Sequence, residues 1–405
     1  MVTKGAIAGE GPKSRTASID ETIGHDASIL SAQLQVLFER LFSPHAKKSL
    51  RRFTSSEVAK LLGVTDSYVR HLATQEDAVT SEKTANGRRT FSLEEINGIR
   101  QHLGRTKPAY LPGRREGDHL QVIAVTNFKG GSGKTTSAIH MAQYLALRGY
   151  RVLALDLDPQ ASMSAMLGFQ PEFDVGDNQT LYGAIRYDDE ARDVREIVRK
   201  TYFPGLDLIP GNLELHEFEH DTPRALADSE RTDNGLFFMR VGNAIAQLEA
   251  DYDVVVIDCP PTLGFLTLSA LCAATSVLIT VHPQMLDIAS MNQFLAMTSD
   301  LLSVVKEAGG NLDYDWMRYL VTRHEANDGP QAQIVAFLRS LFGERVLTSM
   351  MVKSTAVSDA GLSKQTIYEA GRETMHRQTY DRAVESMDAV NSELEQLIRS
   401  VWSKA

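Results

Sequence analysis

The segment Val122–Thr136, VIAVTNFKGGSGKTT, constrains this chain more than any other stretch of its sequence. Its first four residues are apolar and mostly β-branched, as expected of a short buried strand, and residues 137–147 have the composition of a helix. The glycines between the two let successive backbone N–H groups turn toward one point, and the positive end of the helix dipole faces the same point. This arrangement predicts a nucleoside-triphosphate site.

Side chains in this loop have separate expected tasks. Lys134 supplies a point charge for the β- and γ-phosphates, and the Thr135 hydroxyl is placed to bind Mg²⁺. The expected nucleotide-binding residues are Lys129, Gly130, Gly131, Ser132, Gly133, Lys134, Thr135 and Thr136.

The loop departs from the general G-x-x-x-x-G-K-[ST] pattern, because Phe128 replaces the first glycine and a second lysine, Lys129, stands beside it. The run Lys129–Thr136 resembles the deviant Walker A motif of the ParA/MinD family of ATPases, and this resemblance implies ATP or ADP and Mg²⁺ as cofactors. This resemblance implies that Lys129 acts in catalysis together with Lys134, and that Lys129 reaches the nucleotide of the opposite subunit in a homodimer.

Two further strands end in aspartates. Arg151–Leu157 is β-rich and leads into Asp158-Pro159-Gln160, which matches the family's second signature. The resemblance implies that Asp158 orients the attacking water, with Asp156 supporting Mg²⁺ or the loop. The apolar run DVVVI at 253–257 ends in Asp258 and resembles a Walker B strand, so Asp258 is expected to hold Mg²⁺ through water.

Further strand-like runs at 206–211, 276–282 and 319–322 alternate with helical segments. Strands that alternate with helices and end in signature loops indicate a doubly wound α/β fold. We therefore expect the mostly parallel sheet of a deviant P-loop NTPase, preceded by an N-terminal all-α or winged helix-turn-helix DNA-binding domain.

The chain divides into five expected parts. Residues 1–17 form a disordered lead, and 18–45 an amphipathic helix that packs on its own domain or on the same helix of a second chain. A winged helix-turn-helix domain follows at 46–105, then a Pro- and Gly-containing linker at 106–119 and the ATPase domain at 120–405.

Residues 53–75 have helix-turn-helix spacing, with Gly63 in the turn and the second helix facing a major groove. A turn and short strand downstream resemble the wing of a MerR-like winged helix. A helical hairpin used only for packing is the alternative. The expected DNA contacts of this domain are Ser67, Tyr68, Arg70 and His71 on the helix, with Arg88 and Arg89 on phosphates at the wing.

The ATPase domain has two more candidate DNA contacts. Arg323 follows a strand at a place that lies near DNA in the family. The segment 350–360 resembles a partition-ATPase motif, with Lys353 in place of its arginine, and this implies sequence-independent phosphate contact. An ordinary surface lysine is the alternative for Lys353.

Composition limits the class of protein. The net charge is −10, but residues 47–115 carry 14 Lys or Arg against 7 Asp or Glu. A basic segment in an acidic chain suggests a local anionic partner, and a solvated linker region is the alternative. Two cysteines and no apolar run long enough to span a membrane indicate a reducing, cytoplasmic protein. The C-terminal helix carries mostly acidic residues on its polar face, which argues against membrane targeting.

The chain as a whole resembles the larger ParA-type partition proteins, in particular the RepA group of repABC plasmids. This resemblance implies a bacterial, nucleoid-associated protein that forms an ATP sandwich dimer, binds DNA non-specifically and hydrolyses ATP weakly until a ParB-type adaptor stimulates it. It also implies that the N-terminal domain represses the protein's own operon. The alternatives are a MinD-like membrane-cycling ATPase, a metabolic ligase or reductase of the same superfamily, and a repressor that uses nucleotide only as an allosteric ligand.

Overall fold

The computed structural model describes residues 18–41, 48–74, 82–83, 87, 89–228, 236–310 and 312–403. They belong to two compact units, residues 1–48 and 49–405. The expected disordered lead, 1–17, lies outside the described residues. In the first unit, helix α1 (Ile19–Leu41) covers most of the predicted amphipathic helix, and its Ile29 and Leu30 are exposed.

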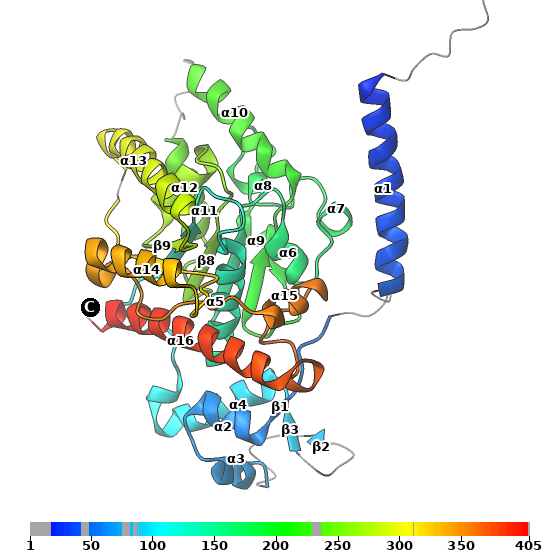
Figure 1. Ribbon diagram of the computed structural model, residues 1–405, viewed down its shortest axis with the longest axis vertical. Helices are drawn as coiled ribbons and strands as arrows, with labels where there is room; N and C mark the ends of the chain where they lie inside the picture. The colour runs from blue at the N-terminus through cyan, green and yellow to red at the C-terminus, as the bar shows by residue number, and fades with distance from the viewer. Residues whose placement is uncertain are drawn as a thin grey trace, which may run out of the picture. The chain divides into compact units, whose positions relative to one another are not determined.

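A seven-stranded sheet organises the second unit (Figure 1). Its strand order is β10-β9-β4-β8-β5-β7-β6, and all neighbours are parallel except β6 and β7. This confirms the predicted mostly parallel α/β sheet. The strands are β4 (Gln121–Thr126), β5 (Val152–Asp156), β6 (Arg199–Lys200), β7 (Leu206–Ile209), β8 (Val254–Asp258), β9 (Ser276–Val281) and β10 (Trp316–Val321).

Helices bury both faces of this sheet, which explains why its strands are apolar throughout. In β4, Ile123 and Val125 face α5 (Lys134–Arg148), whereas Val122 and Ala124 face the opposite core. The first core also receives α15 (Thr355–Leu362) and α16 (Arg377–Trp402). The second core receives α8 (Tyr182–Ile185), α9 (Val194–Ile197), α10 (His216–Ala227), α11 (Arg240–Ala246), α12 (Phe265–Ala273), α13 (Met285–Glu307) and α14 (Gly329–Phe342).

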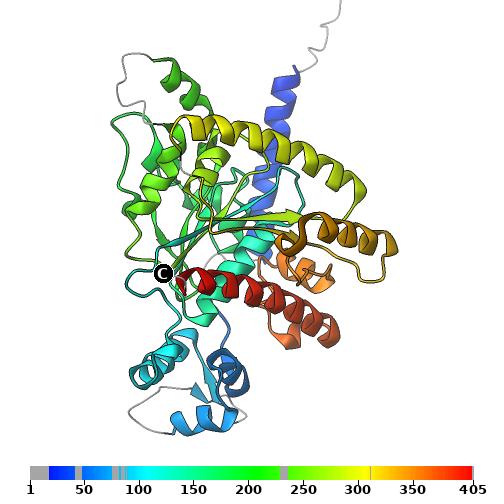
Figure 2. The same ribbon diagram turned by 90° about the vertical axis from the view of Figure 1, so that its left-hand side faces the viewer.

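Shorter elements complete the α/β part of the chain. They are α6 (Ser162–Met166) and α7 (Pro171–Asp174), with 3₁₀ turns η2 (Leu213–Leu215), η3 (Phe237–Met239), η4 (Gly343–Arg345) and η5 (Arg372–Thr374). In the view of Figure 2, α13 (yellow) and α16 (red) lie on either side of the sheet.

A small helical module precedes the sheet. It contains α2 (Ser55–Leu62), α3 (Asp66–Leu72) and α4 (Leu93–Thr106), with a three-stranded antiparallel sheet in the order β1-β3-β2. Its strands are β1 (Phe53–Thr54), β2 (Glu82–Lys83) and β3 (Arg89–Phe91). Thr54 and Glu57 form a capping box at the start of α2, and Gly63 ends that helix with φ of 67°.

This module packs against the end of α5. The Arg100 side chain on α4 is buried and donates a hydrogen bond from Nη2 to the carbonyl oxygen of Leu147. Arg148 donates from Nη1 to the Leu61 carbonyl oxygen at 3.3 Å. The apolar cores of the module and of the α5 face of the sheet are therefore continuous.

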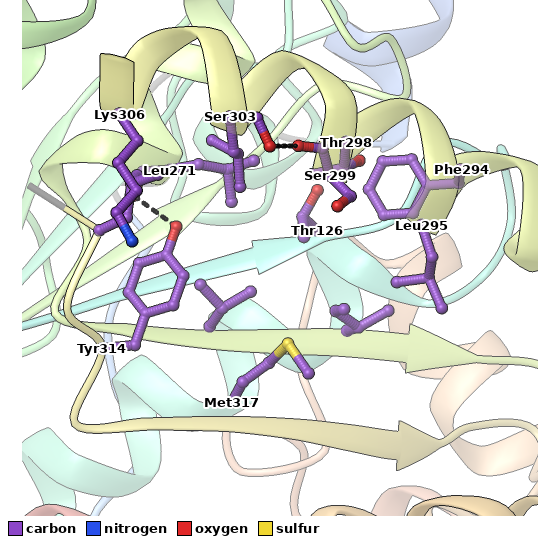
Figure 3. Close-up of a pocket in the computed structure, with 14 residues that line it drawn as sticks. Thr126, Leu271, Phe294, Leu295, Thr298, Ser299, Ser303, Lys306, Tyr314 and Met317 are labelled. Atoms are coloured by element: carbon purple, nitrogen blue, oxygen red, sulfur yellow. Dashed lines mark hydrogen bonds between the residues drawn. The ribbon is translucent and has the colours of Figure 1, made fainter. Parts of the chain in front are cut away.

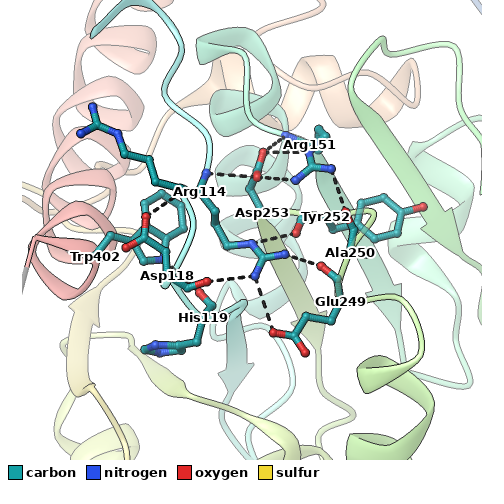
Figure 4. Close-up of polar contacts among 10 residues, drawn as sticks. Arg114, Asp118, His119, Arg151, Glu249, Ala250, Tyr252, Asp253 and Trp402 are labelled. Atoms are coloured by element: carbon teal, nitrogen blue, oxygen red, sulfur yellow. Dashed lines mark hydrogen bonds and ion pairs between the residues drawn. The ribbon is translucent and has the colours of Figure 1, made fainter. Parts of the chain in front are cut away.

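The predicted linker, 106–119, is held against the sheet (Figure 4). After the 3₁₀ turn η1 (Pro108–Tyr110), the Arg114 backbone N–H donates to Asp253 Oδ1 at 3.2 Å. The Arg114 side chain donates to the Tyr252 carbonyl oxygen at 3.1 Å, and Arg151 pairs with the same Asp253 at 2.8 Å. Asp253 thus joins the linker to the amino-terminal end of β8.

The C-terminal helix α16 buries its apolar stripe. Met387, Val390, Leu394 and Ile398 are buried in the core that α5 shares, so this stripe is covered by protein. Within the part of the chain that the structure describes, no helix is long and apolar enough to cross a membrane.

Candidate nucleotide site

The predicted phosphate loop lies between the end of β4 and the start of α5, at the carboxyl edge of the sheet. Gly131 and Gly133 have φ of 76° and 87°, in the left-handed region that a side chain disfavours. A Cβ atom on Gly133 would also lie 3.3 Å from the Thr322 side chain. These two glycines are therefore needed for the shape of the loop.

Neighbouring strand ends hold the loop in place. The Ser132 carbonyl oxygen accepts a hydrogen bond from Thr322 Oγ1 at 2.7 Å. The Ser132 hydroxyl accepts one from Thr280 Oγ1 at 3.1 Å. Asn127 Nδ2 donates to the Thr280 carbonyl oxygen at 2.6 Å, and its Oδ1 accepts from the Lys129 N–H at 3.0 Å. Sequence reasoning missed Thr280 and Thr322, since Thr280 on β9 and Thr322, which follows β10, approach the loop only in the folded chain.

Lys134 is buried at the start of α5. Its Nζ donates to the Lys129 carbonyl oxygen at 3.2 Å, so the side chain folds back over the loop. Burial lowers its pKa, and the carboxylates of Asp258 and Asp158 oppose that shift. The charges of the two predicted aspartates therefore act on the predicted phosphate-binding lysine.

Asp258 is the buried acid of the site. Neither of its carboxylate oxygens has a hydrogen-bond partner among the residues that the structure describes. Burial raises its pKa well above the usual range, and the charge of Asp156 adds to the rise, while the nearby Thr135 hydroxyl opposes it. An unsatisfied carboxylate beside a hydroxyl suits a hard cation with oxygen ligands, so these residues fit Mg²⁺.

Asp156 lies directly across from Asp258 in the β5–β8 pair, but its carboxylate is already engaged. Its Oδ2 accepts from the Ser164 N–H at 2.8 Å and from the Ser164 hydroxyl at 2.7 Å. Burial raises its pKa to about 6, against the effect of these bonds. Asp156 is therefore better placed to shape the loop after β5 than to bind a metal ion directly.

Asp158 is half-buried after the end of β5, and its Oδ1 accepts from the Gln160 N–H at 2.9 Å. Its charge opposes the lowering of the Lys134 pKa, which places it near the phosphate loop. The structure thus brings Lys134, Asp158 and Asp258 together at one edge of the sheet.

Lys129 forms an ion pair within its own chain. Its Nζ contacts Asp287 Oδ1 near the start of α13, and Asp287 Oδ2 lies 2.9 Å from His282 Nδ1. Burial lowers the pKa of His282, and the cations Arg323, Lys129 and Lys353 lower it further, so all three lie around this histidine. No sequence pattern pointed to Asp287, which is near Lys129 only in the folded chain.

The candidate DNA-contact residues differ in their exposure and in the partners that they already have. On α3, Ser67, Tyr68, Arg70 and His71 are all exposed, while Val69 and Leu72 are buried in the module. Arg70 pairs with Asp66 on the same helix. Arg88 lies outside the described residues, and Arg89 donates to the Ala73 carbonyl oxygen at the end of α3. Of the other two, Arg323 donates to the phosphate loop and Lys353 pairs with Glu325 at 2.9 Å.

An apolar cavity of about 340 Å³ lies between α13 and strands β9 and β10 (Figure 3). Its walls include Phe294, Leu295 and Leu302 from α13, with Ile279 and Met317 from the strands. None of the described residues that line it is a predicted site residue, so the phosphate loop does not contribute to this cavity.

Comparison with known proteins agrees with this geometry. The family model of an AAA domain matches residues 120–308. A Rhizobium rhizogenes protein described as replication protein A is 58% identical over 381 residues, covering 93% of this chain and 94% of the relative. Protein SopA of Escherichia coli (strain K12) is 31% identical over 333 residues, covering 81% of this chain and 83% of SopA.

A solved structure of a partition protein superposes with a TM-score of 0.63 over 92% of this chain and 98% of that chain. Its 19% sequence identity makes this a likeness of fold alone. The long match to the replication protein, the match to SopA and the P-loop geometry agree with one another. The chain therefore belongs to the ParA/SopA family of plasmid partition ATPases, in its replication protein A (RepA) branch.

Proposed function

We propose that this partition ATPase binds ATP with Mg²⁺, dimerises through the nucleotide, binds DNA in that state and leaves DNA when ATP is hydrolysed. The observation that carries the proposal is the buried, unsatisfied carboxylate of Asp258 at the strand end beside the phosphate loop. A buried acid in that position has a use when it holds a cation against nucleotide phosphates.

Each residue of the site has a proposed role. The N–H groups of residues 130–136 and the Lys134 ammonium bind the phosphates, and Thr135 with Asp258 would hold Mg²⁺, Asp258 through water. Bound Mg²⁺ would neutralise charge on the β- and γ-phosphates. Asp158 orients the attacking water, and most of the rate enhancement comes from positioning and charge compensation.

Dimerisation gives Lys129 its role. We propose that its ion pair with Asp287 opens when ATP joins two subunits, so that Lys129 reaches the partner's nucleotide. Met285 and Leu286, next to Asp287, are 71% and 78% exposed. A partner subunit would cover this apolar surface, and its burial would favour the ATP-bound dimer.

DNA is the proposed partner of two regions. The exposed residues of α3 would enter a major groove as part of a winged helix-turn-helix domain, with the wing near Arg88 and Arg89, and this domain would repress the protein's own operon. Lys353 and Arg323 are the candidates for sequence-independent phosphate contact by the ATP-bound dimer. A ParB-type adaptor would stimulate hydrolysis, and the protein would be cytoplasmic and nucleoid-associated.

The rival functions have less support. A MinD-like membrane cycle would need a free basic amphipathic helix, whereas the apolar stripe of α16 is buried against protein. A repressor that uses nucleotide only as an allosteric ligand would have no need of a water-orienting carboxylate at Asp158.

Asp158→Ala tests the proposal. The variant should bind ATP and non-specific duplex DNA as tightly as the wild type, while phosphate release falls by at least about 100-fold, because the attacking water is no longer oriented. Asp177→Ala, at an exposed carboxylate, is the matched control. Unchanged turnover in Asp158→Ala, or DNA release by that variant at the wild-type rate, would contradict the assignment.

A further inference from the structure

The end of β10 meets the phosphate loop through two consecutive side chains. Buried Thr322 donates from Oγ1 to the Ser132 carbonyl oxygen at 2.7 Å, and exposed Arg323 donates from Nη1 to the Gly131 carbonyl oxygen at 3.1 Å. Two successive carbonyl groups of the loop are therefore held from the same strand end.

The backbone of Arg323 supports a special role for this contact. Its φ of 53° lies in the left-handed region, which is unfavourable for a residue with a Cβ atom and persists only where the surroundings fix it. Hydrogen bonds fix the residues on either side. The Thr322 N–H donates to the Val281 carbonyl oxygen at 2.9 Å, and the His324 N–H donates to the Met351 carbonyl oxygen at 2.9 Å.

These contacts control where the loop N–H groups point. In a trans peptide the C=O and N–H groups point in opposite directions. Holding the Gly131 carbonyl oxygen therefore directs the Ser132 N–H, and holding the Ser132 carbonyl oxygen directs the Gly133 N–H. Both N–H groups therefore point away from the Thr322 and Arg323 side chains that hold the two carbonyl oxygens.

We propose that Arg323 is a positioning residue for the phosphate loop and acts through the Gly131 carbonyl group. This role does not depend on contact with DNA. The inference rests on the proposed nucleotide site. Arg323 shapes the cradle before ATP arrives, and its loss leaves the Gly131–Ser132 peptide free to rotate. The strain at φ of 53° is retained because it aims the guanidinium at the loop.

The test measures affinity for a fluorescent ATP analogue with Mg²⁺ on the full chain, without DNA. Arg323→Ala should bind about tenfold more weakly, as expected for loss of one charge-assisted hydrogen bond. Arg323→Gly also removes the side chain, so its affinity for the analogue should be as weak as that of Arg323→Ala. Because glycine relaxes the strained backbone, the melting temperature of this variant without nucleotide should not fall. Arg323→Lys should recover part of the affinity, because an ammonium group can still donate to a carbonyl oxygen.

A control separates this role from charge and strain in general. Lys364→Ala removes a cation from a residue with φ of 52°, and it should bind the analogue like the wild type. Wild-type affinity in Arg323→Ala, with or without weaker DNA binding, would overturn the inference. Failure of the wild-type chain to bind the analogue would instead overturn the nucleotide site on which it depends.

Discussion

At the residue scale, Lys129 has two alternative anionic partners, Asp287 in its own chain and the nucleotide phosphates of a partner subunit. In the single chain its ammonium group pairs with Asp287, whose second oxygen lies 2.9 Å from His282 Nδ1. In the proposed dimer it leaves Asp287 for the phosphates of the partner's nucleotide. The free energy gained across the dimer must therefore exceed that of a partly exposed ion pair, which is about 1 kcal/mol or less.

Lys129→Gln should separate binding from turnover. The variant keeps Lys134 and the glycines of the loop, so its ATP affinity should stay within about threefold of the wild type, whereas turnover should fall at least about 100-fold, as for loss of a charge that acts on the transition state. Sedimentation with ATP should show monomers. Unaltered hydrolysis by this variant would exclude a role across the dimer.

Three separate motifs predicted Lys134, Asp158 and Asp258 as site residues, and the structure places them at one edge of the sheet. Their roles in binding and catalysis stay predictions. Thr322 and Asp287 were missed, because each contacts the phosphate loop only in the folded chain and comes from a segment far away in the sequence. Arg89 was expected at the wing surface, but its guanidinium donates to Ala73 at the end of α3.

Helix α5 joins two parts of the second unit at the element scale. It begins at Lys134 in the phosphate loop and ends at Arg148, against α2 and α4 of the helical module. Arg100 is buried at that junction, and burial lowers its pKa to about 10, with the charge of Arg148 adding to the shift and Glu395 opposing it.

Arg100→Ala should loosen this junction. It removes a buried hydrogen bond to the Leu147 carbonyl group and the packing of the side-chain stem, so the free energy of unfolding should fall by about 2–3 kcal/mol in urea titration. Arg105→Ala, at an exposed arginine on the same helix, should change it by less than about 0.5 kcal/mol. Equal effects of the two substitutions would show that Arg100 does not hold the module.

His140, on the same helix, should make the free energy of unfolding of the chain depend on pH. Burial lowers its pKa from 6.5 to about 4, while its Nδ1 lies 2.7 Å from the Thr136 carbonyl oxygen and its Nε2 accepts from the Ile367 N–H. Between these two pKa values the unfolded chain binds the proton and the folded chain does not. Stability contributed by neutral His140 is therefore complete above about pH 6.5 and declines as the pH falls toward 4.

The comparison with His140→Gln isolates this contribution. Between pH 7 and pH 5 the wild type should lose about 2 kcal/mol more of its free energy of unfolding than the variant does, as measured by urea titration at each pH. Parallel pH profiles for the two proteins would mean that His140 titrates normally in the folded chain.

At the scale of the whole molecule, sequence patterns predict the sheet better than they predict the contacts between its parts. The alternation of strands and helices predicted the sheet because each buried strand carries its own apolar signal. The segment 106–119 was expected to be a linker on its Pro and Gly content, yet Arg114 is bound to Asp253 and Tyr252 through contacts that composition does not encode. The helical module likewise shares its core with the α5 face of the sheet.

The central claim is that the nucleotide controls DNA binding by the whole protein. The most direct test is fluorescence anisotropy of a non-specific DNA duplex, titrated with the full chain at one fixed salt concentration without nucleotide, with ADP, with ATP and with a non-hydrolysable ATP analogue. Fixed salt is essential, because phosphate contacts make the affinity strongly salt-dependent. We expect tight binding with ATP and the analogue only. Equal binding in all four conditions would contradict the account and assign DNA binding to the helical module alone.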